Sequence, residues 1–254
     1  MKQNFYRFFL MGNEGEFMNA QELLKRYAAG EKDFMGVKLR NAFLTGASLN
    51  SVKFNGAALS GTRLDTALLR NANLDGALLD GTNLNDADLS YATLNGAYLS
   101  ADLNRTNFTQ TSLRGVQIIE THLQKTNFWQ ADLSGAYLEK VRLERVNLEN
   151  ALLMGVRVCE SRLENVNLAF ADLTGAFITE TCLYSVDFSH ANLKCAQISS
   201  ELMKVNFTGA CLIGAEIYAS SLGNETIQQL ERDGVIFHNT ILPDGTTYTS
   251  KLIG

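Results

Sequence analysis

Apolar residues recur at every fifth position through most of this chain. From Phe34 onward, Leu, Phe, Ile or Val returns in steps of five up to Leu99, and after one four-residue step the series runs from Leu103 to Ile198. A second four-residue step leads into a last stretch from Leu202 to Leu222. The residue two before each apolar centre is Ala, Val, Thr or Ser in 38 of 39 units.

A period of five fits neither of the common elements. It would wander around a helix of about 3.6 residues per turn, and it breaks the strict alternation of a strand. It suits a chain that turns a corner every five residues and sends one large and one small side chain inward on each wall. The small position follows from packing, because a narrow shaft already holding the large side chains has no room for a second bulky one. The candidate core includes Leu74, Leu94, Phe108, Phe128, Leu133, Leu173, Phe188 and Phe207.

Glycines give the number of walls in each coil. Gly36, Gly56, Gly76 and Gly96 are 20 residues apart, so four five-residue walls make one turn. The next interval, from Gly96 to Gly115, is 19 residues because it contains the first four-residue step. The glycines therefore stay at the same corner of the coil, and each four-residue step shortens one coil by one residue. A glycine at a fixed corner indicates a positive φ or a close approach of neighbouring chain. A second column of the same period, which we expect to form an amide ladder between coils, contains Asn107, Asn127, Asn147, Asn167, Asp187 and Asn206.

Units such as Ala72-Asn73-Leu74, Ala131-Asp132-Leu133 and Ala191-Asn192-Leu193 resemble the A(D/N)LXX motif of the pentapeptide-repeat family. The resemblance covers residues 32–222 and implies an all-β fold, a right-handed quadrilateral parallel β-helix. The segments 18–24 and 242–245 are similar to those of cyanobacterial members.

The ends of an open solenoid need caps, because its first and last strands expose unpaired edges. Asn19 with Glu22 fits a capping box, and Gly30 fits a helix stop, so we expect a short capping helix within residues 18–31, with Leu23, Leu24 and Tyr27 on one face. Residues 1–17 are expected to be a flexible tail. In residues 223–254 we expect a helix from Asn224 or Thr226 to Asp233, a last half-coil centred on Phe237 and Leu242, and a tail that is loose or docked on a side face.

The reactive side chains form no catalytic pattern. His122, His190 and His238 occupy three different phases of the repeat and lack ligand-spaced carboxylates or cysteines, so no metal site is expected. Cys159, Cys182, Cys195 and Cys211 form no CxxC pair and are expected to be reduced thiols. The sequence contains no GxSxG motif and no phosphate-binding loop. We therefore expect no catalytic residues and no cofactor.

Charge is mild overall and uneven along the chain. The net charge is −5 and no basic block occurs, so direct nucleic-acid binding and membrane binding are not expected. Residues 32–63 are basic, with Lys32, Lys38, Arg40, Lys53 and Arg63 against Asp33. Residues 65–102 are acidic and supply the candidate interaction surface, which consists of Asp65, Asp75, Asp80, Asp86, Asp88 and Asp102. Arg142, Glu144, Arg162 and Glu164 are expected to form a surface ion-pair cluster.

These features predict a non-catalytic cytoplasmic scaffold that binds an unknown protein partner, as a monomer or an end-to-end dimer. The family resemblance leaves two alternatives. One is a DNA mimic that regulates or protects a type II topoisomerase such as gyrase, although the acidic patch is short and adjoins a basic one. The other is a developmental regulator of the kind found in filamentous cyanobacteria.

Overall fold

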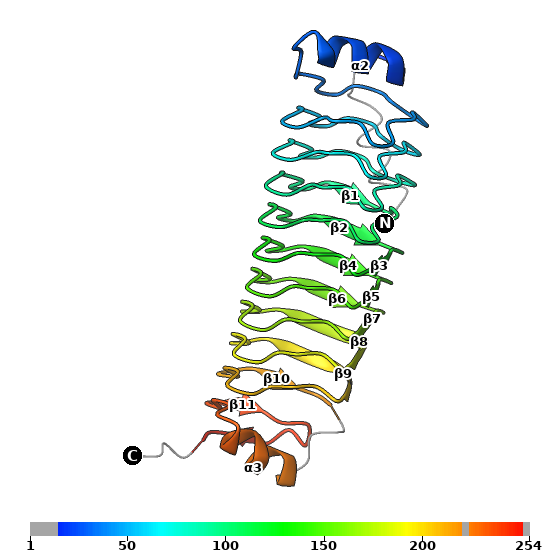
Figure 1. The fold of residues 1–254 in the computed structure, drawn as a ribbon. Helices are drawn as coiled ribbons and strands as arrows, with labels where there is room; N and C mark the ends of the chain where they lie inside the picture. Colours follow the sequence, from blue (N-terminus) through cyan, green and yellow to red (C-terminus); the bar gives the residue numbers. More distant parts are fainter. Residues whose placement is uncertain (1–14, 220–223, 251–254) are drawn as a thin grey trace.

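The protein is a rod of stacked coils with one helix at each end (Figure 1). The computed structural model describes residues 15–219 and 224–250. Successive coils pair in parallel, 20 residues apart: Ile118 lies beside Leu138, and Leu138 lies beside Val158. The pairing interval falls to 19 at the four-residue steps, where Asn83 pairs with Asp102 and Thr181 with Ser200. The coil length and both slips expected from the sequence are thereby confirmed.

Each coil has four walls, which we name by their inward-facing centres. Wall A carries Leu74 and Leu133, and wall B, the next wall along the chain, carries Leu79 and Leu138. Wall C carries Leu84 and Leu143, and wall D carries Leu89, Phe108 and Phe128. All of these side chains are buried.

Most walls are too short to form more than an isolated bridge with the next coil, and the longer strands lie on walls B and C. Wall B contains β1 (Tyr98–Leu99), β2 (Gln117–Ile119), β4 (Tyr137–Glu139), β6 (Arg157–Cys159) and β10 (Glu216–Ile217). Wall C contains β3 (His122–Gln124), β5 (Arg142–Glu144) and β7 (Arg162–Glu164). Strands β8 (Phe177–Tyr184) and β9 (Gln197–Met203) run across both walls and join the two ladders.

The shaft is filled as the five-residue pattern predicts. The eight candidate core residues are at most 3% exposed. Phe108 stacks on Phe128 with ring centroids 4.9 Å apart, and Phe188 stacks on Phe207 at 5.3 Å. Where Thr takes the small inward position, its hydroxyl donates to a backbone carbonyl, either of the preceding coil, as from Thr82 to Leu59 (2.9 Å), or of the residue two before it, as from Thr121 to Ile119 (3.0 Å). That bond explains why Thr is tolerated inside, since a buried polar group without a partner is destabilising.

Nearly every corner has a left-handed backbone, whether or not it is glycine. The corners between walls A and B carry the predicted glycine column, with φ near +65°, as at Gly135 (+67°). The same conformation recurs at Arg105 (φ 57°), Lys140 (φ 55°) and Phe170 (φ 59°). For residues other than glycine this conformation costs about 1–2 kcal/mol. Hydrogen bonds offset that cost: at the corner before Ala131, its N–H donates to the Phe128 carbonyl (2.9 Å).

Helix α2 (Ala20–Ala28) covers the first coil, as predicted. The Asn19 side chain accepts a hydrogen bond from the Glu22 N–H (2.9 Å), and Gly30 follows the helix with φ +100°. Leu23 is fully buried, but Leu24 is 37% exposed, so the expected apolar face is narrower than the sequence indicated. A correction also applies to the predicted tail. Phe17 pairs with Lys38, so pairing with the first coil begins inside residues 1–17, while residues 1–14 lie outside the described part.

The other end is closed by α3 (Asn224–Arg232) and a hairpin. The repeat returns after the helix, as expected, because Phe237 and Leu242 are buried and Ile236 pairs with Cys211. Strand β11 (Thr240–Ile241) continues wall B, and β12 (Thr247–Tyr248) pairs with it in the antiparallel direction. The segment after residue 245 is therefore docked as far as it is described, and residues 251–254 lie outside that part. No helix in the described ranges is long and apolar enough to span a bilayer.

Candidate interaction surfaces

The six aspartates of the predicted acidic surface do not share a face. Their register places Asp75 on wall A, Asp80 on wall B, Asp65 and Asp102 on wall C, and Asp88 on wall D. Asp86 lies at the corner between walls C and D, with φ 59°. Residues close in sequence are distributed around the coil because each wall uses only five of them. The prediction of one acidic patch is therefore wrong.

Half of these aspartates are also neutralised by neighbours. Asp86 accepts from the Arg105 guanidinium (2.6 Å, Nε to Oδ1), Arg70 lies 3.7 Å from Asp88, and Arg63 lies 3.4 Å from Asp65. The hydrogen bonds from Arg105 hold the pKa of Asp86 below its ordinary value. Asp75, Asp80 and Asp102 have no ion pair within the described ranges, so the negative potential of this region is weaker than a count of carboxylates suggests.

The amide column on wall D is a structural ladder, as predicted. Asn147 donates to Asn127 (3.1 Å), and Asn127 donates to Asn107 (3.4 Å). The same Asn147 side chain accepts from the N–H of Glu149 two residues on (3.2 Å). Each amide is thus used within the fold, which leaves little of its hydrogen-bonding capacity for a partner.

The charged cluster on wall C is confirmed as well. Arg142 lies 3.8 Å from both Glu144 and Glu164, and Arg162 lies 3.3 Å from Glu164. Both arginines are about half exposed, so each pair stabilises the fold by at most about 1 kcal/mol. The cluster therefore adds little to the free energy of unfolding, and it holds the charged side chains of this wall beside one another.

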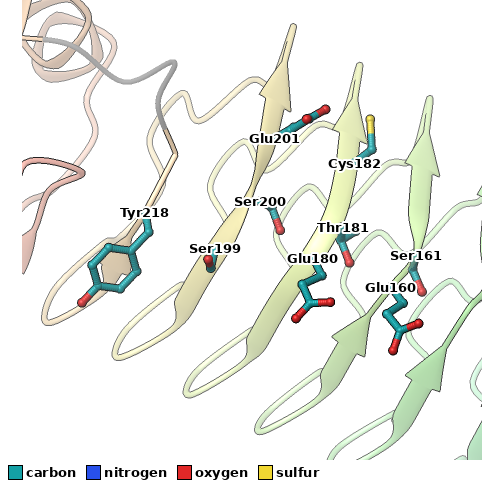
Figure 2. A pocket seen from close by; sticks show the side chains of 9 residues that line it. All are labelled: Glu160, Ser161, Glu180, Thr181, Cys182, Ser199, Ser200, Glu201 and Tyr218. Carbon is teal, nitrogen blue, oxygen red and sulfur yellow. The ribbon is translucent and has the colours of Figure 1, made fainter.

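A shallow groove of about 670 Å³ lies at the corner between walls B and C (Figure 2). It follows from the second four-residue step: β9 has one residue fewer than β8 between the two walls, and Glu180 has no counterpart in the register. In Figure 2, Glu160 and Glu180 lie one coil apart and point the same way. The groove is lined by Glu160, Ser161, Glu180, Thr181, Cys182, Ser199, Ser200, Glu201 and Tyr218.

Three of the hydroxyl groups that line the groove donate to backbone carbonyls. Ser161 donates to the Cys159 carbonyl (2.7 Å), Thr181 to the Thr179 carbonyl (2.8 Å) and Ser200 to the Ile178 carbonyl (3.2 Å). No histidine lines the groove, and these three hydroxyls donate to the backbone rather than to a side-chain base. This groove is not among the features predicted from the sequence, although the four-residue step after Ile198 marks its position.

One cysteine, Cys182, lines the groove, and the other three lie elsewhere on the rod. The four cysteines are free, and the thiol of Cys159 lies 3.5 Å from the Tyr137 hydroxyl. That hydrogen bond, together with burial, raises the pKa of Tyr137. Over the described ranges, no group of three or more His, Cys, Asp or Glu residues is arranged to hold a metal ion.

The five-residue period, the 20-residue coil and the buried centres agree with a family model. Pentapeptide repeats match this sequence in eight copies, over segments that together span residues 33–189. The protein belongs to the pentapeptide-repeat family. Proteins of this family are generally non-catalytic repeat scaffolds that mediate protein interactions.

Solved structures of pentapeptide-repeat proteins are similar to this chain. One is HetL from the cyanobacterium Nostoc sp. strain PCC 7120, described as involved in heterocyst differentiation regulation. It is 27% identical over 91% of this chain and 100% of its own, with a TM-score of 0.49. QnrB1, a plasmid-mediated fluoroquinolone resistance protein, is 18% identical over 80% of this chain and 90% of its own, with a TM-score of 0.34.

A third structure is AT2G44920 from the thylakoid lumen of Arabidopsis thaliana. It is 19% identical over 74% of this chain and 77% of its own, with a TM-score of 0.16. A search of curated proteins gave no significant match.

Proposed function

We propose that this protein is a non-catalytic scaffold that binds a protein partner through side chains displayed on its walls. The proposal rests on the register in which successive coils pair. Outward residues 20 apart in sequence stand side by side in successive coils, as Arg142 does beside Arg162. Stacked strands lie about 4.8 Å apart, so each wall presents a fixed array of side chains. A rigid array lowers the entropy lost on binding, because its residues are ordered before the partner arrives.

The same geometry supports the absence of catalysis. Catalysis needs a site that holds reacting groups and excludes water. The groove at the corner between walls B and C is open to solvent, and the hydroxyls of Ser161, Thr181 and Ser200 donate to backbone carbonyls. It offers carboxylates for binding but no activated nucleophile.

The distribution of the acidic residues bears on the DNA-mimic alternative. A mimic of duplex DNA needs a long, continuous negative surface. Here the aspartates of residues 65–102 lie on all four walls, and three of them are paired with arginines. We therefore expect no effect on the supercoiling activity of gyrase when the purified protein is added at micromolar concentration, and inhibition or protection in that assay would favour the mimic.

The scaffold proposal is tested by quantitative affinity capture with one charge-altered variant for each wall. Suitable changes are Arg114→Glu on wall A, Arg157→Glu on wall B, Arg142→Glu on wall C and Glu149→Lys on wall D. Each variant is first checked for unchanged circular dichroism and thermal unfolding. We expect one wall variant to lose a partner protein that the other three retain. Identical capture by all four variants would mean that no wall is used.

The proposed compartment is the cytoplasm. The proposal rests on the four free cysteines, since oxidising compartments favour disulfides. Fractionation of the native cells, with detection of the protein by antibody, tests this location directly.

A further inference from the structure

The basic segment around residues 38–63 forms an exposed surface at the N-terminal end of walls B and C. We call it the N-terminal basic surface, and it consists of Phe17, Lys38, Arg40, Phe43 and Arg63. Phe17 is 80% exposed and Phe43 is 71% exposed, the two highest values among large apolar side chains in the described part of the chain. A single exposed apolar side chain is ordinary on a protein surface, so the case for an interaction site rests on the cations that accompany these two rings.

Each ring is held beside a cation. Lys38 pairs with Phe17 across adjacent coils, and its ammonium nitrogen lies 4.8 Å from the ring centroid. Arg63 pairs with Phe43 in the same way, with its guanidinium 5.9 Å from the centroid. Both contacts lie within the range of cation–π attraction. Arg40 is exposed on wall B, one residue before the corner at Asn41 that leads to Phe43 on wall C.

This surface differs from similar pairs elsewhere on the rod. Phe177 beside Arg157 is only 38% exposed. Tyr91 beside Arg70 is 47% exposed, and Arg70 also faces Asp88 at 3.7 Å. By contrast, Lys38 and Arg40 have no ion pair within residues 15–219 and 224–250, and Arg63 has only Asp65 at 3.4 Å. The surface therefore combines unshielded positive charge with exposed rings.

We propose that the N-terminal basic surface binds an acidic segment of a protein partner, with apolar side chains of that segment on Phe17 and Phe43 and its carboxylates at Lys38, Arg40 and Arg63. This inference rests on the proposed scaffold function. Phenylalanine and arginine are enriched at protein–protein interfaces relative to the rest of the surface, and complementary charge contributes to the choice of partner.

The observations favour a protein over a nucleic acid. Nucleic-acid affinity depends on neutralising many phosphates, whereas this surface offers three cations, one of which faces an aspartate. The whole chain carries a net charge of −5, which repels a polyanion. A short protein segment needs only a few carboxylates and supplies the apolar side chains that the rings can cover.

Selection from a displayed library of random peptides about 12 residues long, with the full-length protein as bait, tests the assignment. We expect the recovered peptides to be rich in Asp and Glu and to contain Leu, Phe or similar residues. Phe43→Ser combined with Arg63→Gln should weaken their binding at least 10-fold, as should Lys38→Gln combined with Arg40→Gln. The matched control is Phe177→Ser combined with Arg157→Gln, which removes the same pair of residue types from another coil and should leave binding unchanged. All variants are compared by thermal unfolding first.

Three outcomes would overturn the inference. One is recovery of neutral or basic peptides, and another is equal binding of the recovered peptides to the wild type and to the Phe43/Arg63 variant. The third is tighter binding of a single-stranded oligothymidylate than of the acidic peptides, which would assign the surface to nucleic acid. Each result is separable from the scaffold proposal, because the four wall variants can still lose or keep a partner independently of this surface.

Discussion

At the scale of single residues, position within the five-residue unit decides the role of a side chain. Leu152 and Leu153 are adjacent and chemically identical, yet Leu152 is 39% exposed on wall A and Leu153 is 3% exposed in the shaft. Thr is tolerated at the small inward position because its hydroxyl donates to a backbone carbonyl. Arginine, lysine and phenylalanine each occupy corner positions with positive φ. Composition alone carries none of this information.

The two adjacent leucines provide a prediction about stability. Leu153→Ala should lower the free energy of unfolding by about 2–5 kcal/mol, because it leaves a cavity in a packed core. Leu152→Ala removes the same atoms from a partly exposed position and should cost less than about 1 kcal/mol. Urea unfolding followed by circular dichroism measures both. Equal losses would contradict the assignment of Leu153 to the shaft.

A second prediction concerns the ion pair of Asp86 with Arg105. Because Arg105 hydrogen bonds lower the pKa of Asp86 below 3.8, the pair favours the folded state above that pH, and its contribution is lost as the pH falls through the lowered pKa. Arg105→Gln should therefore raise the pKa of Asp86 toward its ordinary value, which carboxyl NMR titration measures. Since the arginine is half exposed, stability at neutral pH should change little. An unaltered pKa in the variant would show that the pair does not form in solution.

At the scale of elements, walls are held together by ladders that cross between coils. On wall D, asparagines donate along the column and also accept from their own backbone two residues on. The short strands of walls B and C gain order because each pairs with a coil above and below. A single wall of five residues has little independent stability, so the stacking of coils determines which elements form.

The ladder can be tested at its middle. Asn147→Ala removes the donor to Asn127 and the acceptor for the Glu149 N–H, and it should cost about 1–3 kcal/mol. Asn147→Asp retains the acceptor and the shape but loses the donor, so it should cost less than alanine at neutral pH. Thermal unfolding of the two variants decides the order. A larger loss for Asp than for Ala would mean that charge repulsion along the column outweighs the hydrogen bond to the backbone.

At the scale of the whole molecule, contacts run only between neighbouring coils, and both irregular coils lose a residue at the same corner. The steps after Leu99 and after Ile198 both fall between walls B and C. In these two coils the chain crosses the corner without a left-handed residue, whereas regular coils have one at the same corner, such as Lys140 (φ 55°). The helices then cover the two ends, where the ladder of coils has no further partner.

Removal of one coil tests this modular arrangement. Deletion of residues 134–153 joins Leu133 to Met154 and preserves the order of walls, since Asp132 and Leu152 are equivalent positions in adjacent coils. We expect a cooperatively folded protein with a modestly lower melting temperature. Deletion of residues 134–151 breaks the five-residue phase and should abolish cooperative unfolding. If the shorter deletion folds as well as the longer one, the register does not control assembly.

The sequence predicts most of the fold but little of the interaction surface. The sequence contains repeated signals for the buried centres, the coil length and the four-residue steps, and a local signal for the N-terminal cap. Each of these features can therefore be predicted without knowing the fold. The acidic aspartates were grouped because they are near in sequence, and the four-walled coil separates them. The groove beside Glu180 and the exposed rings of Phe17 and Phe43 depend on how consecutive coils lie against each other.

The amino-acid sequence by itself therefore determined the inside of this protein, because a narrow shaft filled by one large and one small residue per wall imposes a strict period on the chain. The tertiary structure alone decided the outside. Outward positions have no such packing constraint, and a surface is made of residues about 20 apart, such as Phe43 and Arg63, whose proximity exists only once the coils are stacked.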